Sequence, residues 1–160
     1  MKYITLIRHA AAVHDSSYRD YDRPLRQKGI DKARLNTERL TSLGFQPDLI
    51  ISSPAERALQ TAEIFISESG CGLAPEDILQ LESLYLPSPG DILECIQDID
   101  ERFSDVFLFS HNNGLSWAAQ ELSDDRSILM PTGAAVRIEL NIDSWQDTAF
   151  GKGRRLDFLP

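Results

Sequence analysis

Three short motifs in this chain combine arginine, histidine and serine side chains in a way that suits the binding of an anion. They are Arg8-His9, Ser52-Ser53-Pro54 with Arg57 three residues later, and Ser110-His111. An arginine offers planar N–H donors that match two phosphate oxygens at once, and a neutral histidine nitrogen can attack phosphorus. Together the motifs predict a cationic phosphate pocket that contains a nucleophile.

Each motif directly follows a short apolar run that is typical of a buried strand. The runs cover residues 2–8, 48–51 and 106–109. In an open α/β sheet, ligands bind just beyond the carboxyl ends of the strands, and right-handed crossovers bring those ends to one edge. We therefore expect the two arginines and two histidines of the motifs to meet at a single edge of a sheet.

The rest of the chain alternates helix and strand signals, without a linker, a repeat or a low-complexity segment. The signals predict helices over 27–43, from Ser53 to Gly70, from Ser88 onward and from Gly114 through Leu122, further strands over 78–81 and 135–142, and a polar tail. Such alternation is typical of a mostly parallel sheet between two layers of helices. The sequence predicts one domain over residues 1–160, an α/β fold arranged as a three-layer α/β/α sandwich.

Composition excludes several classes of partner. The formal net charge of −9 argues against nucleic acid, whose partners carry basic surfaces. No segment approaches the ~18 consecutive apolar residues of a membrane span, and Lys2 opens directly into a strand rather than a signal peptide. Cys71 and Cys95 lack metal-ligand spacing and are interpreted as structural thiols of a reducing compartment. We expect a cytoplasmic protein that binds neither nucleic acid nor a membrane.

The charges are unevenly distributed along the chain. Residues 19–34 contain six basic and three acidic side chains, which favours steering of anions toward the nearby Arg8-His9 motif. Residues 63–101 contain ten acidic side chains and no lysine or arginine. A solvated face explains this acidic stretch, which leaves open whether it repels acidic substrates or docks a basic partner.

The three motifs resemble those of the histidine phosphatase superfamily, which includes the phosphoglycerate mutases and acid phosphatases. The matching segments are Arg8-His9-Ala10, where the family has Arg-His-Gly, then Ser53-Pro54-x-x-Arg57-Ala58-x-x-Thr61-Ala62, and Ser110-His111-Asn112. The compact length and the segment Arg23-Pro24-Leu25-x-x-x-Gly29 are most similar to the SixA-type phosphohistidine phosphatases. The resemblance implies a phosphoglycerate mutase-like fold.

The resemblance also implies a role for each motif residue. His9 would be the nucleophile that forms a phosphohistidine intermediate, with Arg8 and Arg57 clamping the phosphoryl oxygens. His111 would donate a further hydrogen bond as charge builds up. Asn112 and Arg23 are additional candidates for phosphate binding, although Arg23 alternatively pairs with a nearby aspartate. No metal or other cofactor is implied, because the cationic side chains neutralise the phosphate.

The identity of a general acid decides between two substrate classes. Larger family members carry an acid after the third strand, where this chain has Glu82 beside Ser83. An ester needs such an acid, whereas phosphohistidine leaves as imidazole, which titrates near ~6.5 without help.

We therefore expect a phosphorylated signalling protein as substrate. Two alternatives stay open. They are a phosphatase of small phosphate esters with Glu82 as acid, and a module that binds phosphate or phosphohistidine without turnover. His14, Asp15 and Asp22 are interpreted as surface residues of the following loop.

Overall fold

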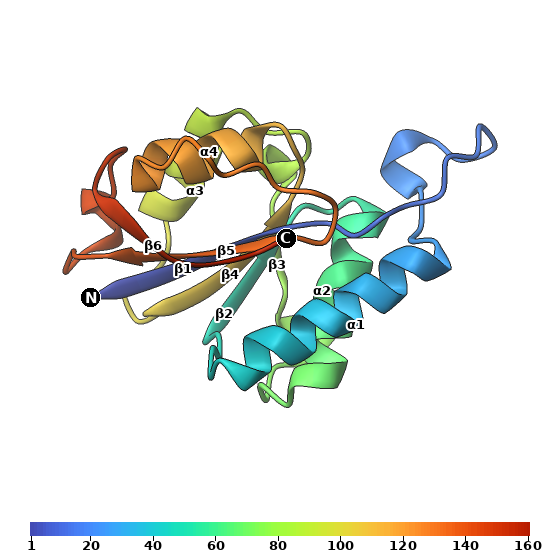
Figure 1. The fold of residues 1–160 in the computed structure, drawn as a ribbon, viewed down its shortest axis with the longest axis horizontal. Helices are drawn as coiled ribbons and strands as arrows, with labels where there is room; N and C mark the ends of the chain where they lie inside the picture. The colour runs from blue at the N-terminus through green and yellow to red at the C-terminus, as the bar shows by residue number, and fades with distance from the viewer.

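The computed structural model describes residues 1–160, and its centre is a six-stranded sheet with helices on both faces (Figure 1). The strands lie in the order β3 (Leu79–Gln80), β2 (Leu49–Ser52), β4 (Asp105–Ser110), β1 (Lys2–Arg8), β5 (Ala135–Leu140) and β6 (Gly153–Leu159). The first four run parallel, β5 is antiparallel to β1, and β6 is antiparallel to β5. The predicted mostly parallel sheet is confirmed.

Two pairs of helices complete the three layers. Figure 1 shows α1 (Gln27–Ser42) and α2 (Glu56–Ser69) on one face of the sheet, and α3 (Pro89–Gln97) and α4 (Gly114–Ser123) on the other. The short 3-10 helices are η1 (Asp20–Asp22), η2 (Pro75–Asp77), η3 (Glu82–Leu84) and η4 (Trp145–Asp147). The predicted three-layer α/β/α sandwich is confirmed. None of the helices combines the length and apolar character that a membrane crossing requires.

The central strand β1 shows why these residues form a buried strand. Successive side chains of a strand point to opposite faces of the sheet. Ile4 and Leu6 join the apolar core under α3 and α4, whereas Ile7 joins the core under α1 and α2. Because both faces of β1 are covered, the run of apolar residues is continuous instead of alternating.

Three details differ from the predictions. The expected polar tail is strand β6, which pairs with β5 through a register shift between Arg137 and Ile138; exposed Arg154 and Arg155 concealed its strand pattern. The strand expected over 78–81 contains only Leu79–Gln80. The helix expected to start at Ser53 begins at Glu56. The residue that flanks its N-terminus is Ala55, which has no side chain that could cap the helix.

Two glycines hold the loop after β1 in place. A Cβ atom at Gly29 of α1 would lie 2.2 Å from the carbonyl oxygen of Ala11, so only glycine lets the helix approach this loop. Gly133 adopts a left-handed conformation with φ +79°. Its N–H donates to the carbonyl oxygens of Arg8 and His9 at 3.2 and 2.9 Å. These close contacts restrict the backbone that carries the predicted nucleophile.

Candidate active site

A cavity of about 390 Å³ lies beyond the carboxyl end of β1 and brings the predicted site residues together. Its lining includes Arg8 and His9 at the end of β1, Arg57 on α2, and His111 and Asn112 after β4. The loop between β1 and α1 contributes His14, Asp20, Arg23 and Arg26. The cavity therefore collects four arginines and three histidines around a single carboxylate.

The ring of His9 is held with one nitrogen available for attack. Its Nδ1 lies 2.7 Å from the carbonyl oxygen of Ala10, which can only accept, so the proton resides on Nδ1 and Nε2 keeps its lone pair. The side chain is 8% exposed, and burial together with the charges of Arg57 and Arg8 lowers its pKa to about 4. His9 is therefore neutral and nucleophilic at neutral pH.

One arginine contacts this nitrogen, and a second arginine lines the same cavity. The Nε of Arg57 lies 3.4 Å from Nε2 of His9, and its side chain is only 2% exposed. Arg8 donates from Nη1 to the carbonyl oxygen of Met130 at 2.9 Å, while its Nε is buried and has no partner. A buried N–H without an acceptor is costly. An anion beside Arg8 would satisfy it.

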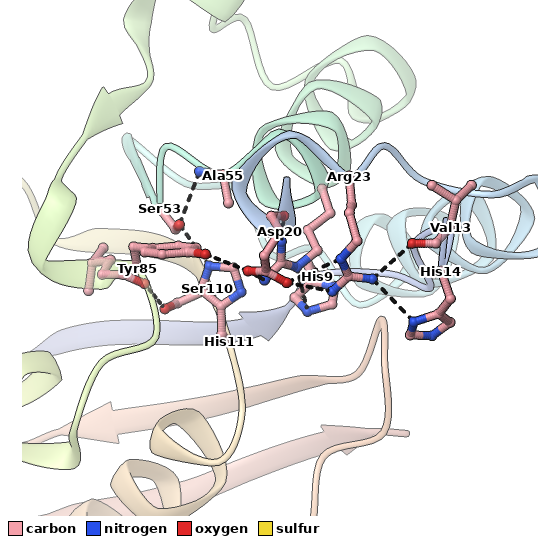
Figure 2. A network of polar contacts seen from close by, with 12 residues as sticks. His9, Val13, His14, Asp20, Arg23, Ser53, Ala55, Tyr85, Ser110 and His111 are labelled. Atoms are coloured by element: carbon pink, nitrogen blue, oxygen red, sulfur yellow. Dashed lines mark hydrogen bonds and ion pairs between the residues drawn. The ribbon is translucent and has the colours of Figure 1, made fainter. Parts of the chain in front are cut away.

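A serine sets the proton position on the second histidine. The Oγ of Ser53 accepts the N–H of Ala55 at 3.2 Å and lies 2.7 Å from Nε2 of His111 (Figure 2). When the Ser53 hydroxyl donates to this nitrogen, the proton of His111 resides on Nδ1. This Nδ1 is buried and has no partner, which leaves it free to donate to a phosphoryl oxygen. Burial, followed by the charges of His9 and Arg57, lowers the pKa of His111 to about 3.

The only carboxylate of the cavity belongs to Asp20 in η1, and it is strongly hydrogen-bonded. Arg57 donates to its carbonyl oxygen at 2.6 Å and to Oδ2 at 3.1 Å, and Arg23 donates to Oδ1 at 3.1 Å. Tyr85 donates its hydroxyl proton to Oδ2 (Figure 2). The Tyr85 hydrogen bond and the two arginines lower the pKa of Asp20 to about 2. Asp20 is therefore ionised, and its carboxylate occupies a position next to Arg57 that another anion could take.

Glu82 lies outside the cavity lining. It accepts a hydrogen bond from the hydroxyl of Tyr21 at 2.9 Å, and Tyr21 packs edge-on against Tyr85 with ring centroids 5.1 Å apart. Tyr85 in turn packs edge-on against His111. The neighbouring Ser83 faces a different cavity. Two aromatic rings thus connect Glu82 to the phosphate pocket, and its carboxylate does not line it.

The remaining candidates line the cavity but are already bonded. Asn112 donates to the carbonyl oxygen of Met130 and accepts from both the N–H and the hydroxyl of Ser116, so its side chain serves the fold. Arg23 takes the alternative expected for it, a pair with Asp20. His14 is exposed, as expected, and it also lines the cavity, with its Nδ1 3.5 Å from Nη1 of Arg23.

The sequence reasoning missed Asp20 and considered its neighbours instead. Asp15 is exposed and accepts from the N–H of its own turn, and Asp22 pairs with exposed Arg19. The spacing of Asp20 three residues before Arg23 could have indicated an ion pair between them. An arginine expected in a pocket, such as Arg57, also needs an acceptor, and Asp20 provides one. The roles of Ser53 and Tyr85 also went unpredicted, although Ser53 belongs to one of the segments that carry the resemblance.

The arrangement provides every group needed to hold a phosphoryl group against a nitrogen nucleophile. Arg8 and His111, each with a buried nitrogen that has no partner, line the same cavity as His9, and Arg57 reaches Nε2 of His9 directly. Preorganised donors of this kind stabilise the charge that develops during phosphoryl transfer. No group of three or more histidine, cysteine, aspartate or glutamate side chains is arranged to hold a metal ion.

Sequence comparisons identify related proteins. The model of the histidine phosphatase superfamily (branch 1) matches residues 4–82. An uncharacterized chloroplastic protein of Arabidopsis thaliana is 31% identical over 152 residues, which cover 90% of this chain and 69% of that protein.

Solved structures show where the fold recurs. A structure from Agrobacterium tumefaciens that bears the name phosphohistidine phosphatase SixA has a TM-score of 0.84 and 23% identity, covering 99% of this chain and 97% of that one. The protein histidine phosphatase SixA complexed with tungstate has a TM-score of 0.80 and 24% identity, covering 98% and 96%. At these identities the similarity shows a shared fold, and the expected phosphoglycerate mutase-like architecture is confirmed.

Proposed function

The chain belongs to the histidine phosphatase superfamily and is a phosphatase, and we propose that it hydrolyses protein phosphohistidine through a phosphorylated His9. The observation that supports this most strongly is the state of His9. Its Nδ1 proton is bonded to the carbonyl oxygen of Ala10, and its Nε2 lone pair faces the arginines. A neutral, oriented imidazole is the nucleophile that this reaction needs.

The reaction proceeds in two displacements. Nε2 of His9 attacks phosphorus, the P–N bond of the substrate breaks, and the departing imidazole takes a proton from solvent. A water molecule then attacks the phosphorylated His9, the P–Nε2 bond breaks, and His9 returns to its neutral form. Inorganic phosphate departs with both protons of that water and releases one of them to solvent. Arg8 and Arg57 hold the phosphoryl oxygens in both steps, and His111 donates from Nδ1.

The lack of a protonated carboxyl group in the cavity favours phosphohistidine over a phosphate ester. Asp20 is the only carboxylate there, and its pKa of about 2 keeps it ionised. Glu82, the acid required by the small-ester alternative, bonds Tyr21 outside the lining. An alkoxide leaving group depends on a general acid, whereas an imidazole protonates from solvent near neutral pH.

Phosphate release from a phosphohistidine-bearing protein tests the proposal, with wild type and His9→Ala compared in EDTA. We expect turnover by the wild type only. A series of aryl phosphates then measures the dependence on the leaving group, and a steep fall in rate with rising leaving-group pKa is expected. A flat series would support an ester phosphatase with a working acid. Binding of the phosphoprotein without release of phosphate would support the non-catalytic module.

A further inference from the structure

A second and larger cavity lies away from the candidate active site. It has a volume of about 540 Å³, lies between α3 and the β2–β3 edge of the sheet, and shares no residue with the phosphate pocket. Its apolar lining is formed by Leu49, Ile51, Leu79, Leu81, Ile99 and Phe103. We call this cavity the α3 groove.

The α3 groove is open to solvent along its outer side. Strand β3 is the edge of the sheet and contains only Leu79–Gln80. The side chain of Leu79 is 45% exposed, although it continues the apolar lining. Figure 1 shows α3 above the sheet, on the face opposite α1 and α2. An apolar surface of this kind is typical of a binding site for another molecule.

The groove has no reactive group that would indicate catalysis. Cys95 is its only thiol, and burial raises the pKa of that thiol to about 12. A thiol that remains protonated is neither a nucleophile nor a metal ligand. Cys95 therefore acts as part of the apolar wall, and the groove is a place for binding.

The border of the groove is strongly acidic. Asp91, Glu94, Asp98 and Asp100 all line it, against the single cation Arg102. Arg102 forms an exposed ion pair with Asp100, with nitrogen and oxygen 3.7 Å apart. Glu94 and Asp98 have no ion-pair partner within the chain, and all four carboxylates are exposed.

The position of Glu94 and Asp98 is unfavourable for the isolated protein. They are one helical turn apart, and like charges at this spacing repel. They also lie at the C-terminal end of α3, where the helix dipole favours cations. Residues 63–101 contain no lysine or arginine that could neutralise them. Arg102, the one cation of the groove, pairs with Asp100, so a further cation for Glu94 and Asp98 would come from another molecule.

We propose that the α3 groove docks a segment of a partner protein that carries lysine or arginine beside apolar side chains. The cations pair with Glu94 and Asp98, while the apolar side chains cover Leu79, Ile99 and Phe103. Charge complementarity identifies this occupant, because a nucleic acid or an anionic membrane would be repelled by the border. The proposal gives the acidic stretch a docking role and does not depend on the chemistry at His9.

A fluorescent synthetic peptide of leucine and lysine with an amphipathic pattern serves as the probe, and binding is measured by anisotropy. We expect Glu94→Gln/Asp98→Asn to weaken binding about tenfold, and Leu79→Ser to weaken it by a similar factor. The matched control Glu38→Gln/Glu63→Gln removes the same charge from α1 and α2 on the opposite face, and binding should stay at the wild-type level. Methyl NMR signals of Leu79 and Ile99 should shift on titration.

Two results would overturn the proposal. Equal weakening by the groove pair and by the control pair would mean a general attraction to the negative charge of the protein. Equal binding of a peptide with serine in place of leucine would mean that no apolar side chain enters the groove. Hydrolysis of an aryl phosphate should be unchanged in Glu94→Gln/Asp98→Asn, so failure of the docking proposal is distinguishable from failure of the proposed phosphatase.

Discussion

The molecule contains two arginine–aspartate pairs with a buried arginine, and they differ in what surrounds them. Arg137 of β5 donates to both oxygens of Asp105 at 2.6 and 2.7 Å, and its guanidinium lies between the rings of Tyr3 and Phe45. Both partners of this pair belong to the sheet. Its arginine is 5% exposed.

In the Arg57–Asp20 pair of the candidate active site, the aspartate is held less firmly than the arginine. The side chain of Arg57 is 2% exposed, but that of its partner Asp20 is 48% exposed and belongs to a loop. Only one carboxylate oxygen of Asp20 meets Arg57, at 3.1 Å. The remaining donor of the guanidinium faces His9 instead of the aspartate.

The two carboxylates also differ in the direction of their pKa shift. Burial is the main effect on Asp105 and raises its pKa, in spite of the opposing charge of Arg137. Hydrogen bonds from Tyr85 and the arginines lower the pKa of Asp20. We expect the bidentate pair within the sheet to serve stability, and Arg57, whose partner is exposed, to serve binding. A phosphoryl group can take the place of the Asp20 carboxylate.

Exchanging the two arginines for alanine should separate these roles most clearly. Arg57→Ala should lower kcat/KM about 10³-fold, because a preorganised donor to the phosphoryl group is lost. Arg137→Ala should instead lower the free energy of unfolding by about 3 kcal/mol, because it leaves the partly buried Asp105 without its partner. Steady-state kinetics and urea unfolding of both variants measure this. A large loss of stability in Arg57→Ala with normal turnover would reverse the assignment.

Ser53→Ala should produce the next largest effect. Without the hydroxyl, nothing holds the proton of His111 on Nδ1, so we expect kcat/KM to fall about 10–100-fold. Ser53→Thr keeps the hydroxyl and should restore most of the rate, which a purely structural role of Ser53 would not explain. Equal rates for the alanine variant and the wild type would remove Ser53 from the mechanism.

Asp20→Asn should have a smaller effect, with the opposite sign for binding. The carboxylate competes with phosphate for Arg57, so its neutralisation should tighten the binding of inorganic phosphate about tenfold, or about 1.4 kcal/mol. Isothermal titration calorimetry measures the dissociation constant. The matched change Asp105→Asn should leave phosphate binding unchanged while lowering stability. Weaker phosphate binding by Asp20→Asn would contradict the idea of a resident anion.

The effect of pH on the stability contributed by His9 should be the smallest of these effects near pH 7. His9 titrates near pH 4 in the folded protein and near ~6.5 in the unfolded chain, so the unfolded chain binds more protons between these values. Stability from His9 is therefore complete above pH 6.5 and is lost as the pH falls through about 4. NMR of the His9 imidazole should give a midpoint near 4. A midpoint near 6.5 would place this ring in a hydrated environment.

The sequence predicted the parts of the site that follow from strand ends. Arg8 ends strand β1, and His9 and His111 directly follow β1 and β4, so the register of the parallel sheet determines where these residues lie. Asp20 was missed because it belongs to a loop whose path depends on tertiary contacts with Arg57 and Tyr85.

The assignment of Glu82 illustrates the same limit. After the two-residue strand β3, a shift of one position changes the side to which a residue points. Here Glu82 bonds Tyr21, which packs against Tyr85. Strand β6 was missed because an edge strand with exposed arginines carries little of the apolar pattern that identifies central strands.

The central claim is that His9 carries the phosphoryl group during turnover. Rapid mixing with an aryl phosphate, quenching in base and mass spectrometry of the peptides would locate the phosphoryl group directly. We predict phosphorylation on His9 that appears and decays within a turnover, and no phosphorylated peptide in His9→Ala. Turnover by His9→Ala, or a phosphoryl group found on another residue, would contradict the account.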